Sequence, residues 1–225
     1  MAWSDPGDFT SGQVLTAANM DAIREGMFFG MPTFSTEAAR DTAYGAPLSP
    51  IALQEGMRAY ITASTVAAAT GGSTAVPTGI TTVYNGSAWV CTTPVSAYTS
   101  NAGTYTGSLA YTATLGGTPG TNPSVTLATG TTALVSIAAL CSNNAIAGGA
   151  IVSVAVSGAT TLAASNDYAV NYDNSTASYL ITLAQTMVIT GLTAGTNTFT
   201  LNYSLNNAAN TATFQRRRIT VQGIA

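Results

Sequence analysis

The sequence predicts a mainly β protein whose C-terminal part is an antiparallel β-sandwich of jelly-roll type, preceded by a short N-terminal helix and a small α+β module. Apolar and polar residues alternate with period two along much of the second half, and Gly, Asn and Pro separate the alternating segments. Between Arg58 and Arg216 the only charged residues are Asp167 and Asp173. The surface there must consist of Thr, Ser, Asn and small apolar side chains, which are typical of strands and turns.

The first region, residues 1–30, is predicted to contain a short helix. Thr16 can cap this helix, and Leu15 and Met20 stand at the positions of a hydrophobic staple. Because so short a helix is marginal by itself, its apolar residues need a partner surface, either on the same chain or on another subunit of a larger assembly. The second alternative gives six candidate attachment residues: Leu15, Met20, Ile23, Met27, Phe28 and Phe29.

Residues 31–93 are predicted to form the α+β module. A helix is expected over residues 35–44, with Ser35 or Thr36 as its cap and Glu37 in its first turn. Residues 57–62 predict a strand, and Asn85-Gly86 within residues 81–90 predicts a hairpin with a type I′ turn. Residues 63–79 are expected to be a loop. Residues 94–107, rich in Ser, Thr and Gly, are expected to be a linker.

Residues 108–225 are predicted to form the β-sandwich from about nine strands. The clearest alternation is in residues 199–205, where Phe, Leu and Tyr alternate with Thr, Asn and Ser. Further strands are expected at 109–115, 124–128, 132–140, 152–156, 167–172, 178–183, 186–190 and 213–222.

Three consecutive arginines stand in the last predicted strand. Arg217 shares a face with Ile219 and is expected near the rim of the core, whereas Arg216 and Arg218 point to the other face. Three roles are open for these side chains: pairing with Asp167, Asp173 or carbonyl groups at a sheet end, contact with a neighbouring subunit or particle, or phosphate binding. Arg216 and Arg218 are therefore candidate subunit contacts.

The composition excludes most catalytic chemistry. The chain has no His and no Lys, so the common hydrolytic triad, Schiff-base chemistry and the P-loop are impossible. Asp167 and Asp173 would lie roughly 20 Å apart on a straight strand, too far to act together. A calcium site from these acids with Asn171 and Asn174 matches no EF-hand spacing, and turn formation explains them better. We predict no catalytic residue, no cofactor and no metal: the protein is not expected to be an enzyme.

Partners are bounded by charge and hydropathy. A net charge of −3 argues against nucleic acid as the main partner. The apolar stretches are too short to span a bilayer and no secretory signal is present, so we expect no membrane insertion and reduced Cys91 and Cys141, although their pairing stays open. The abundant tyrosines could stack on sugars, which keeps a glycan-binding module as an alternative.

Several short motifs resemble bacteriophage virion proteins of the fibre, minor tail and head-decoration type. Residues 9–25, beginning Phe-Thr-Ser-Gly-Gln-Val-Leu, are similar to their virion-attachment segment, and residues 32–41, 55–60 and 83–90 (Val-Tyr-Asn-Gly-Ser-Ala-Trp-Val) to the small module that follows. Residues 190–203 and 213–221 are similar to the closing strands of their β-domain. The resemblance implies a non-enzymatic virion component, commonly a homotrimer, anchored by its N-terminus to other capsid or tail proteins and exposed on the particle. It does not separate head from tail.

The weak charge of the β-domain agrees with that implication. Like copies repel one another little, so they can associate closely and bury strand faces together. The alternative function is a receptor-binding module that holds host-surface glycans.

Overall fold

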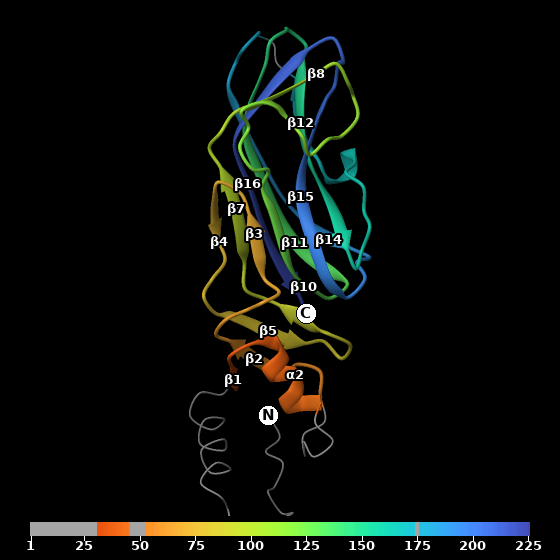
Figure 1. Cartoon of the computed structure of the whole chain (residues 1–225). Helices are drawn as coiled ribbons and strands as arrows, with labels where there is room; N and C mark the ends of the chain where they lie inside the picture. Colours follow the sequence, from red (N-terminus) through yellow and green to blue (C-terminus); the bar gives the residue numbers. More distant parts are fainter. Residues whose placement is uncertain (1–30, 46–52, 174–175) are drawn as a thin grey trace, which may run out of the picture.

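The computed structural model describes residues 31–45, 53–173 and 176–225. The predicted N-terminal helix and the six candidate attachment residues lie outside the described residues: Leu15, Met20, Ile23, Met27, Phe28 and Phe29. The described chain is mainly β, as predicted, and forms an elongated jelly-roll sandwich with the small module at one end (Figure 1). None of its described helices has the length and apolar character that crossing a bilayer requires.

The module is built on a four-stranded sheet. Its strands lie in the order β1 (Thr33–Phe34), β2 (Arg58–Ile61), β5 (Ile80–Tyr84) and β6 (Trp89–Cys91). The predicted helix is confirmed as α2 (Glu37–Gly45), and the Thr36 hydroxyl caps it by accepting a hydrogen bond from the Ala39 amide at 3.2 Å.

The predicted hairpin joins β5 to β6, but its turn is not the expected type I′. Within residues 85–88 only Gly86 has a positive φ, of 89°. The Asn85 side-chain oxygen accepts hydrogen bonds from the amides of Ser87, at 3.2 Å, and Ala88, at 2.9 Å. The side chain of Asn85 therefore organises a four-residue loop, and a second left-handed residue is not needed.

Two antiparallel sheets form the sandwich. The five-stranded sheet has the order β13 (Val170–Asp173), β12 (Gly149–Gly158), β15 (Gly195–Leu205), β10 (Ser124–Thr129) and β3 (Ala68–Thr70). The main path of the seven-stranded sheet is β14 (Ile181–Thr190), β11 (Thr132–Asn143), β16 (Thr211–Ile224), β7 (Val95–Thr99) and β4 (Ser73–Ala75). Off this path, β8 (Gly103–Thr106) pairs with β16 and with β9 (Gly116–Gly117).

Two segments predicted to be irregular are strands. The expected linker, residues 94–107, forms β7 and β8, and both pair with β16. The expected loop, residues 63–79, supplies β3 to one sheet and β4 to the other. These strands are short and rich in Ala, Ser and Thr, so their local signal is weak, and pairing with a long neighbouring strand determines their structure. The module and the sandwich are therefore interleaved along the sequence.

Other predicted strands have different limits. Residues 109–115 form an isolated bridge, Thr112 to Tyr203, in place of a strand. The segments 178–183 and 186–190 merge into β14, and residues 167–172 divide into the short 3-10 helix η1 (Asn166–Tyr168) and β13. The strands predicted at 124–128, 132–140, 152–156, 199–205 and 213–222 are confirmed as β10, β11, β12, β15 and β16.

A bulge in β16 changes which residues face the core. The register to β11 shifts between Ala138 and Leu140. Before the shift Phe214 is buried, and after it Arg217 and Ile219 are buried, so the inward positions change from even to odd numbers. The extra residue is Arg216, whose φ of 50° is left-handed.

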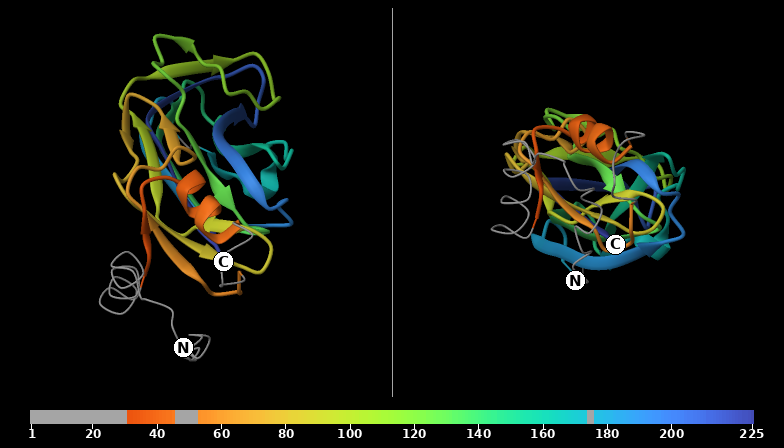
Figure 2. Two further views of the ribbon diagram at one scale, coloured as in Figure 1. Left: turned by 60° about the horizontal axis from the view of Figure 1, so that its bottom comes forward. Right: turned by 90° about the horizontal axis from the view of Figure 1, so that it is seen from below.

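The module is joined to the sandwich at the C-terminal end of β16. A Cβ at Gly223 would lie 2.6 Å from Val90 Cγ1 and 2.7 Å from the Cys91 carbonyl, so only glycine allows β6 to approach β16 this closely. The Gln222 side chain adds a hydrogen bond to the Thr92 carbonyl at 2.8 Å. The views in Figure 2, turned toward this end, show α2 and the β5–β6 hairpin lying across the end of the sandwich.

Candidate functional site

The outer face of the seven-stranded sheet presents mostly neutral side chains around one arginine. Two rows of facing residues cross its strands. One row carries hydroxyl groups on four of its five strands and the other has Arg218 at its centre. We call these rows the hydroxyl face: Thr186, Ser136, Thr220, Ser96 and Ala75 in the first, and Ala184, Ala138, Arg218, Tyr98 and Ser73 in the second.

The four hydroxyl groups of the first row form two hydrogen-bonded pairs. Ser136 and Thr186 are hydrogen-bonded at 2.8 Å, and Ser96 and Thr220 at 2.7 Å. Cross-strand pairs of this kind contribute about 0.2–1 kcal/mol each. The first row is thus polar in composition, but its hydroxyl groups already have hydrogen-bond partners within the chain. Contact with another protein surface therefore leaves few of them without a partner.

Arg218 is the one charge among these two rows. Its guanidinium lies 5.2 Å from the centre of the Tyr98 ring, and a hollow opens on each side of it, of about 230 Å³ toward β14 and about 280 Å³ toward β4. The side chain is exposed and has no ion pair with any described residue. Arg216 is likewise exposed and without an ion pair within the described part of the chain. Of the roles left open for these two arginines, an ion pair with Asp167 or Asp173 of the same chain is therefore not found among the described residues.

Arg217 is fully buried, where the sequence predicted a position near the rim. Its guanidinium donates to the Pro119 carbonyl, to Asn122 Oδ1 at 3.3 Å and to the Tyr203 hydroxyl at 3.2 Å. Among the described atoms its Nε has no hydrogen-bond partner. Burial raises the pKa of Tyr203, and the positive charge of Arg217 opposes that shift. The predicted contact with carbonyl groups is thus confirmed for Arg217, which fastens the loop before β10 to the core.

The two acids of the sandwich do not form a site. Asp167 lies in η1 and Asp173 ends β13, so the straight strand assumed for them is broken. Asp167 Oδ2 accepts a hydrogen bond from Ser165 at 3.5 Å, and Asp173 accepts one from the Asn206 side chain. In residues 31–45, 53–173 and 176–225 no three His, Cys, Asp or Glu side chains gather to hold a metal ion.

A third hollow, of about 260 Å³, lies where the module meets the sandwich, and sequence reasoning missed it. Glu37 and Arg40 line it and are buried. The Glu37 carboxylate accepts hydrogen bonds from Ser64 and from the amide and hydroxyl of Thr65 at 2.9 and 3.0 Å. Burial raises the pKa of Glu37, but these hydrogen bonds outweigh burial and the net shift of the pKa is downward.

Arg40 is satisfied in the same way. It donates to Asp41 at 2.9 and 2.7 Å and to Thr82 at 3.2 Å, and it stacks on the Trp89 ring at 4.5 Å. The charged side chains of Glu37 and Arg40, which line the hollow, thus already have partners within the chain. The hollow is therefore a joint between the module and the sandwich. The available sequence signal was a glutamate and an arginine on one short helix. Apart from Asp41, their partners are distant in the chain.

Both cysteines and several of the tyrosines are buried or pack against the core. Cys91 and Cys141 are free and buried, and burial raises the pKa of both thiols. Tyr203 is fully buried, and Tyr105, Tyr168 and Tyr172 pack against the core. The remaining large exposed tyrosine is Tyr179, beside exposed Leu180, in the segment before β14.

No protein-family model matches this chain, and no curated protein matches its sequence. Among solved structures the fold is similar to Eiger TNF from S. frugiperda, with 8% identity, 56% of this chain and 92% of that chain covered, and a TM-score of 0.35. It is also similar to the CBM22-1–GH10 modules of a Clostridium thermocellum xylanase complexed with xylohexaose (12% identity, 57% and 27% covered, TM-score 0.31). The CBM22-1 xylan-binding domain from Paenibacillus barcinonensis has 11% identity, 56% and 88% coverage and a TM-score of 0.25. Similarities at this level identify neither a family nor a function.

Proposed function

We propose that this protein is a non-enzymatic structural component that associates with copies of itself through the hydroxyl face of its sandwich. The observation that carries the proposal is the state of that face: the hydroxyl groups of its first row are paired with one another, and its one charge, Arg218, has no ionic partner in the described chain. A second copy can cover such a surface without desolvating many charges.

The setting we propose follows from the sequence resemblance. A virion component of the fibre, minor tail or head-decoration type would be anchored by residues 1–30 and would present the sandwich outward, commonly as a trimer. The placement of the module at one end of the elongated body supports this arrangement, because the chain enters the described structure there (Figure 1).

Light scattering after size-exclusion chromatography tests self-association. We expect a mass that is a multiple of 22.7 kDa at micromolar concentration, and a single species of 22.7 kDa would overturn the proposal. Electron cryomicroscopy of intact particles tests the setting, since density for the sandwich outside the capsid or tail is expected.

A second candidate function is glycan binding. It is favoured by the stacked Arg218 and Tyr98 between two hollows lined by hydroxyl groups. A glycan array distinguishes it: binding that is lost in Tyr98→Ala supports this function, and an array without a hit rejects it.

A further inference from the structure

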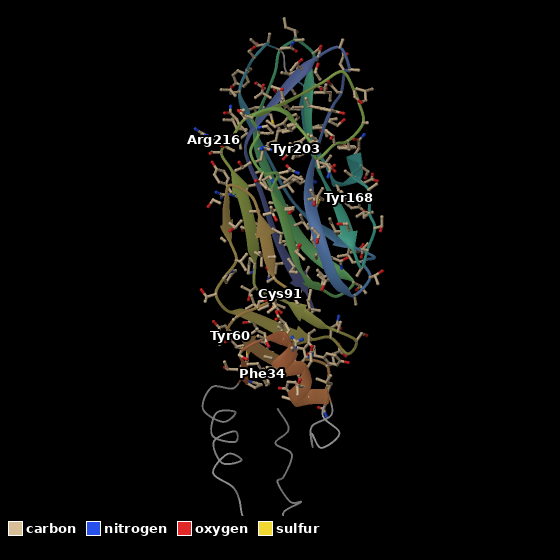
Figure 3. All side chains as sticks on the ribbon, viewed as in Figure 1. Phe34, Tyr60, Cys91, Tyr168, Tyr203 and Arg216 are labelled. Carbon is tan, nitrogen blue, oxygen red and sulfur yellow. The ribbon has the colours of Figure 1, made fainter. Side chains whose placement is uncertain are left out.

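The four exposed charges of the sandwich lie on two separate surfaces. Arg216 and Arg218 belong to β16, inside the seven-stranded sheet, whereas Asp167 is in η1 and Asp173 ends β13, the edge strand of the other sheet. In Figure 3, Arg216 is on one side of the body and Tyr168, the neighbour of Asp167, is on the opposite side. The arginines of one copy therefore lie on a different side of the body from the segment that carries Asp167.

None of these four charges has an ionic partner among the described residues. The acids accept hydrogen bonds only from neutral groups, Ser165 and Asn206, and Arg218 stacks on the neutral ring of Tyr98. In a sandwich with so few charges, two unpaired bases and two unpaired acids are most of its ionic groups. Their complementary signs would be neutralised if one copy met the other surface of the next.

The backbone at Arg216 gives a second, independent reason. Its φ of 50° is a conformation that costs energy for any residue with a Cβ, and a bulge of this kind usually has glycine there. A long charged side chain instead occupies the position, is exposed, and has no ion pair in its own copy within the described residues. Strain of this kind is often retained where a position has a role, and an exposed charge without an ion pair is available to a partner outside the copy.

We propose that the sandwich associates head to tail with further copies of this chain, so that Arg216 and Arg218 of one copy meet Asp167 and Asp173 of the next. This inference rests on the proposed self-association and names its contact. Because the two surfaces lie on different sides, the interface is heterologous and not a two-fold pairing of identical patches. A heterologous contact closes into a ring only where each copy is rotated relative to the one before it, and otherwise continues as an open row of copies.

Charge reversal in the full chain tests the pairing. We expect the variant Arg216→Glu with Arg218→Glu, and separately the variant Asp167→Arg with Asp173→Arg, to dissociate with a dissociation constant raised by about tenfold or more. The variant that carries all four changes restores opposite charges at every interface, so we expect it to assemble again. Arg58→Glu is the matched control, because Arg58 is an exposed arginine of the module, and this variant is expected to assemble like the wild type.

Sedimentation velocity gives the masses, and circular dichroism shows that each variant is folded. If the wild type is a monomer, the proposed function fails. If the wild type assembles and the two reversed variants assemble equally well, self-association stands and the Arg–Asp contact is wrong.

Cross-linking supplies a readout that does not require the fourfold variant to fold. With a short bismaleimide, Arg218→Cys together with Asp173→Cys is expected to give covalent multimers, because the two thiols face each other across the interface. Arg218→Cys alone is expected to give none, since Cys91 and Cys141 are buried. Multimers from Arg218→Cys alone would indicate a two-fold interface and overturn the head-to-tail arrangement.

Discussion

The module and the sandwich each have two charged side chains whose surroundings differ. In the module Glu37 and Arg40 are buried, and each is satisfied by partners of its own chain. In the sandwich Arg218 and Asp173 are exposed, and no described residue pairs with them ionically. The comparison teaches that Glu37 and Arg40 fix a joint inside the fold, whereas Arg218 and Asp173 are available to another molecule.

Arg217 is the exception inside the sandwich, and removing it has the largest expected effect. Arg217→Ala leaves a cavity and deprives Asn122 and the Pro119 carbonyl of a donor. We expect the free energy of unfolding to fall by about 3–5 kcal/mol, measured by chemical denaturation. Arg217→Met keeps most of the volume and should lose less. An unchanged midpoint for the alanine variant would show that the buried guanidinium does not hold the loop.

Glu37→Gln sharpens the comparison from the side of the module. Loss of the charge weakens the hydrogen bonds from Ser64 and Thr65, so we expect about 1–3 kcal/mol less stability near neutral pH. Because the pKa of Glu37 is lowered in the folded protein, its contribution is present above the ordinary value of 4.5 and is lost as the pH falls through the folded pKa. Unfolding curves at several pH values check this. A difference from wild type that does not shrink in acid contradicts it.

Tyr203→Phe is expected to have a smaller effect. The substitution keeps the ring in the core but removes the hydroxyl that donates to Asn122 at 2.7 Å and accepts from Arg217. A loss of about 1–2 kcal/mol in thermal unfolding is expected. If Arg217→Ala and the double variant with Tyr203→Phe are equally stable, the two side chains act as one unit, whereas full additivity would show that they are independent.

Arg216→Asn has the smallest expected effect on stability, with the opposite sign. Asparagine tolerates a left-handed φ better than arginine, so the isolated copy should gain about 0.5 kcal/mol. The same variant should assemble less well, since it lacks the charge. A variant that is both less stable and fully assembled would contradict the role given to this position.

The core strands were predictable from the sequence because each carries its own alternation, as in β15, where Phe199 and Leu201 point inward. β3, β4, β7 and β8 were not, because their short Ala, Ser and Thr segments become strands only beside a long partner. The bulge was also hidden. Within the one strand β16, the apolar inward positions are even-numbered at Phe214 and odd-numbered at Ile219. This change was the signal of a bulge that the sequence offered.

For the site, the sequence correctly predicted that Arg216 and Arg218 share a face away from the core. It could not show that they have no ion pair, because this depends on where η1 and β13 place Asp167 and Asp173. The buried position of Arg217 depends on contacts with a loop far away in the chain. The role of the six residues before residue 30 stays a prediction, because they lie outside the described residues.

The sedimentation velocity of Ser136→Asp, compared with that of Thr104→Asp, tests most directly whether the hydroxyl face holds the copies together. Ser136 is within the face, whereas Thr104 is exposed on β8, outside it. A carboxylate buried between copies is costly, so Ser136→Asp is expected to sediment as a folded monomer of 22.7 kDa while Thr104→Asp assembles like the wild type. Equal assembly of both variants would contradict association through this face.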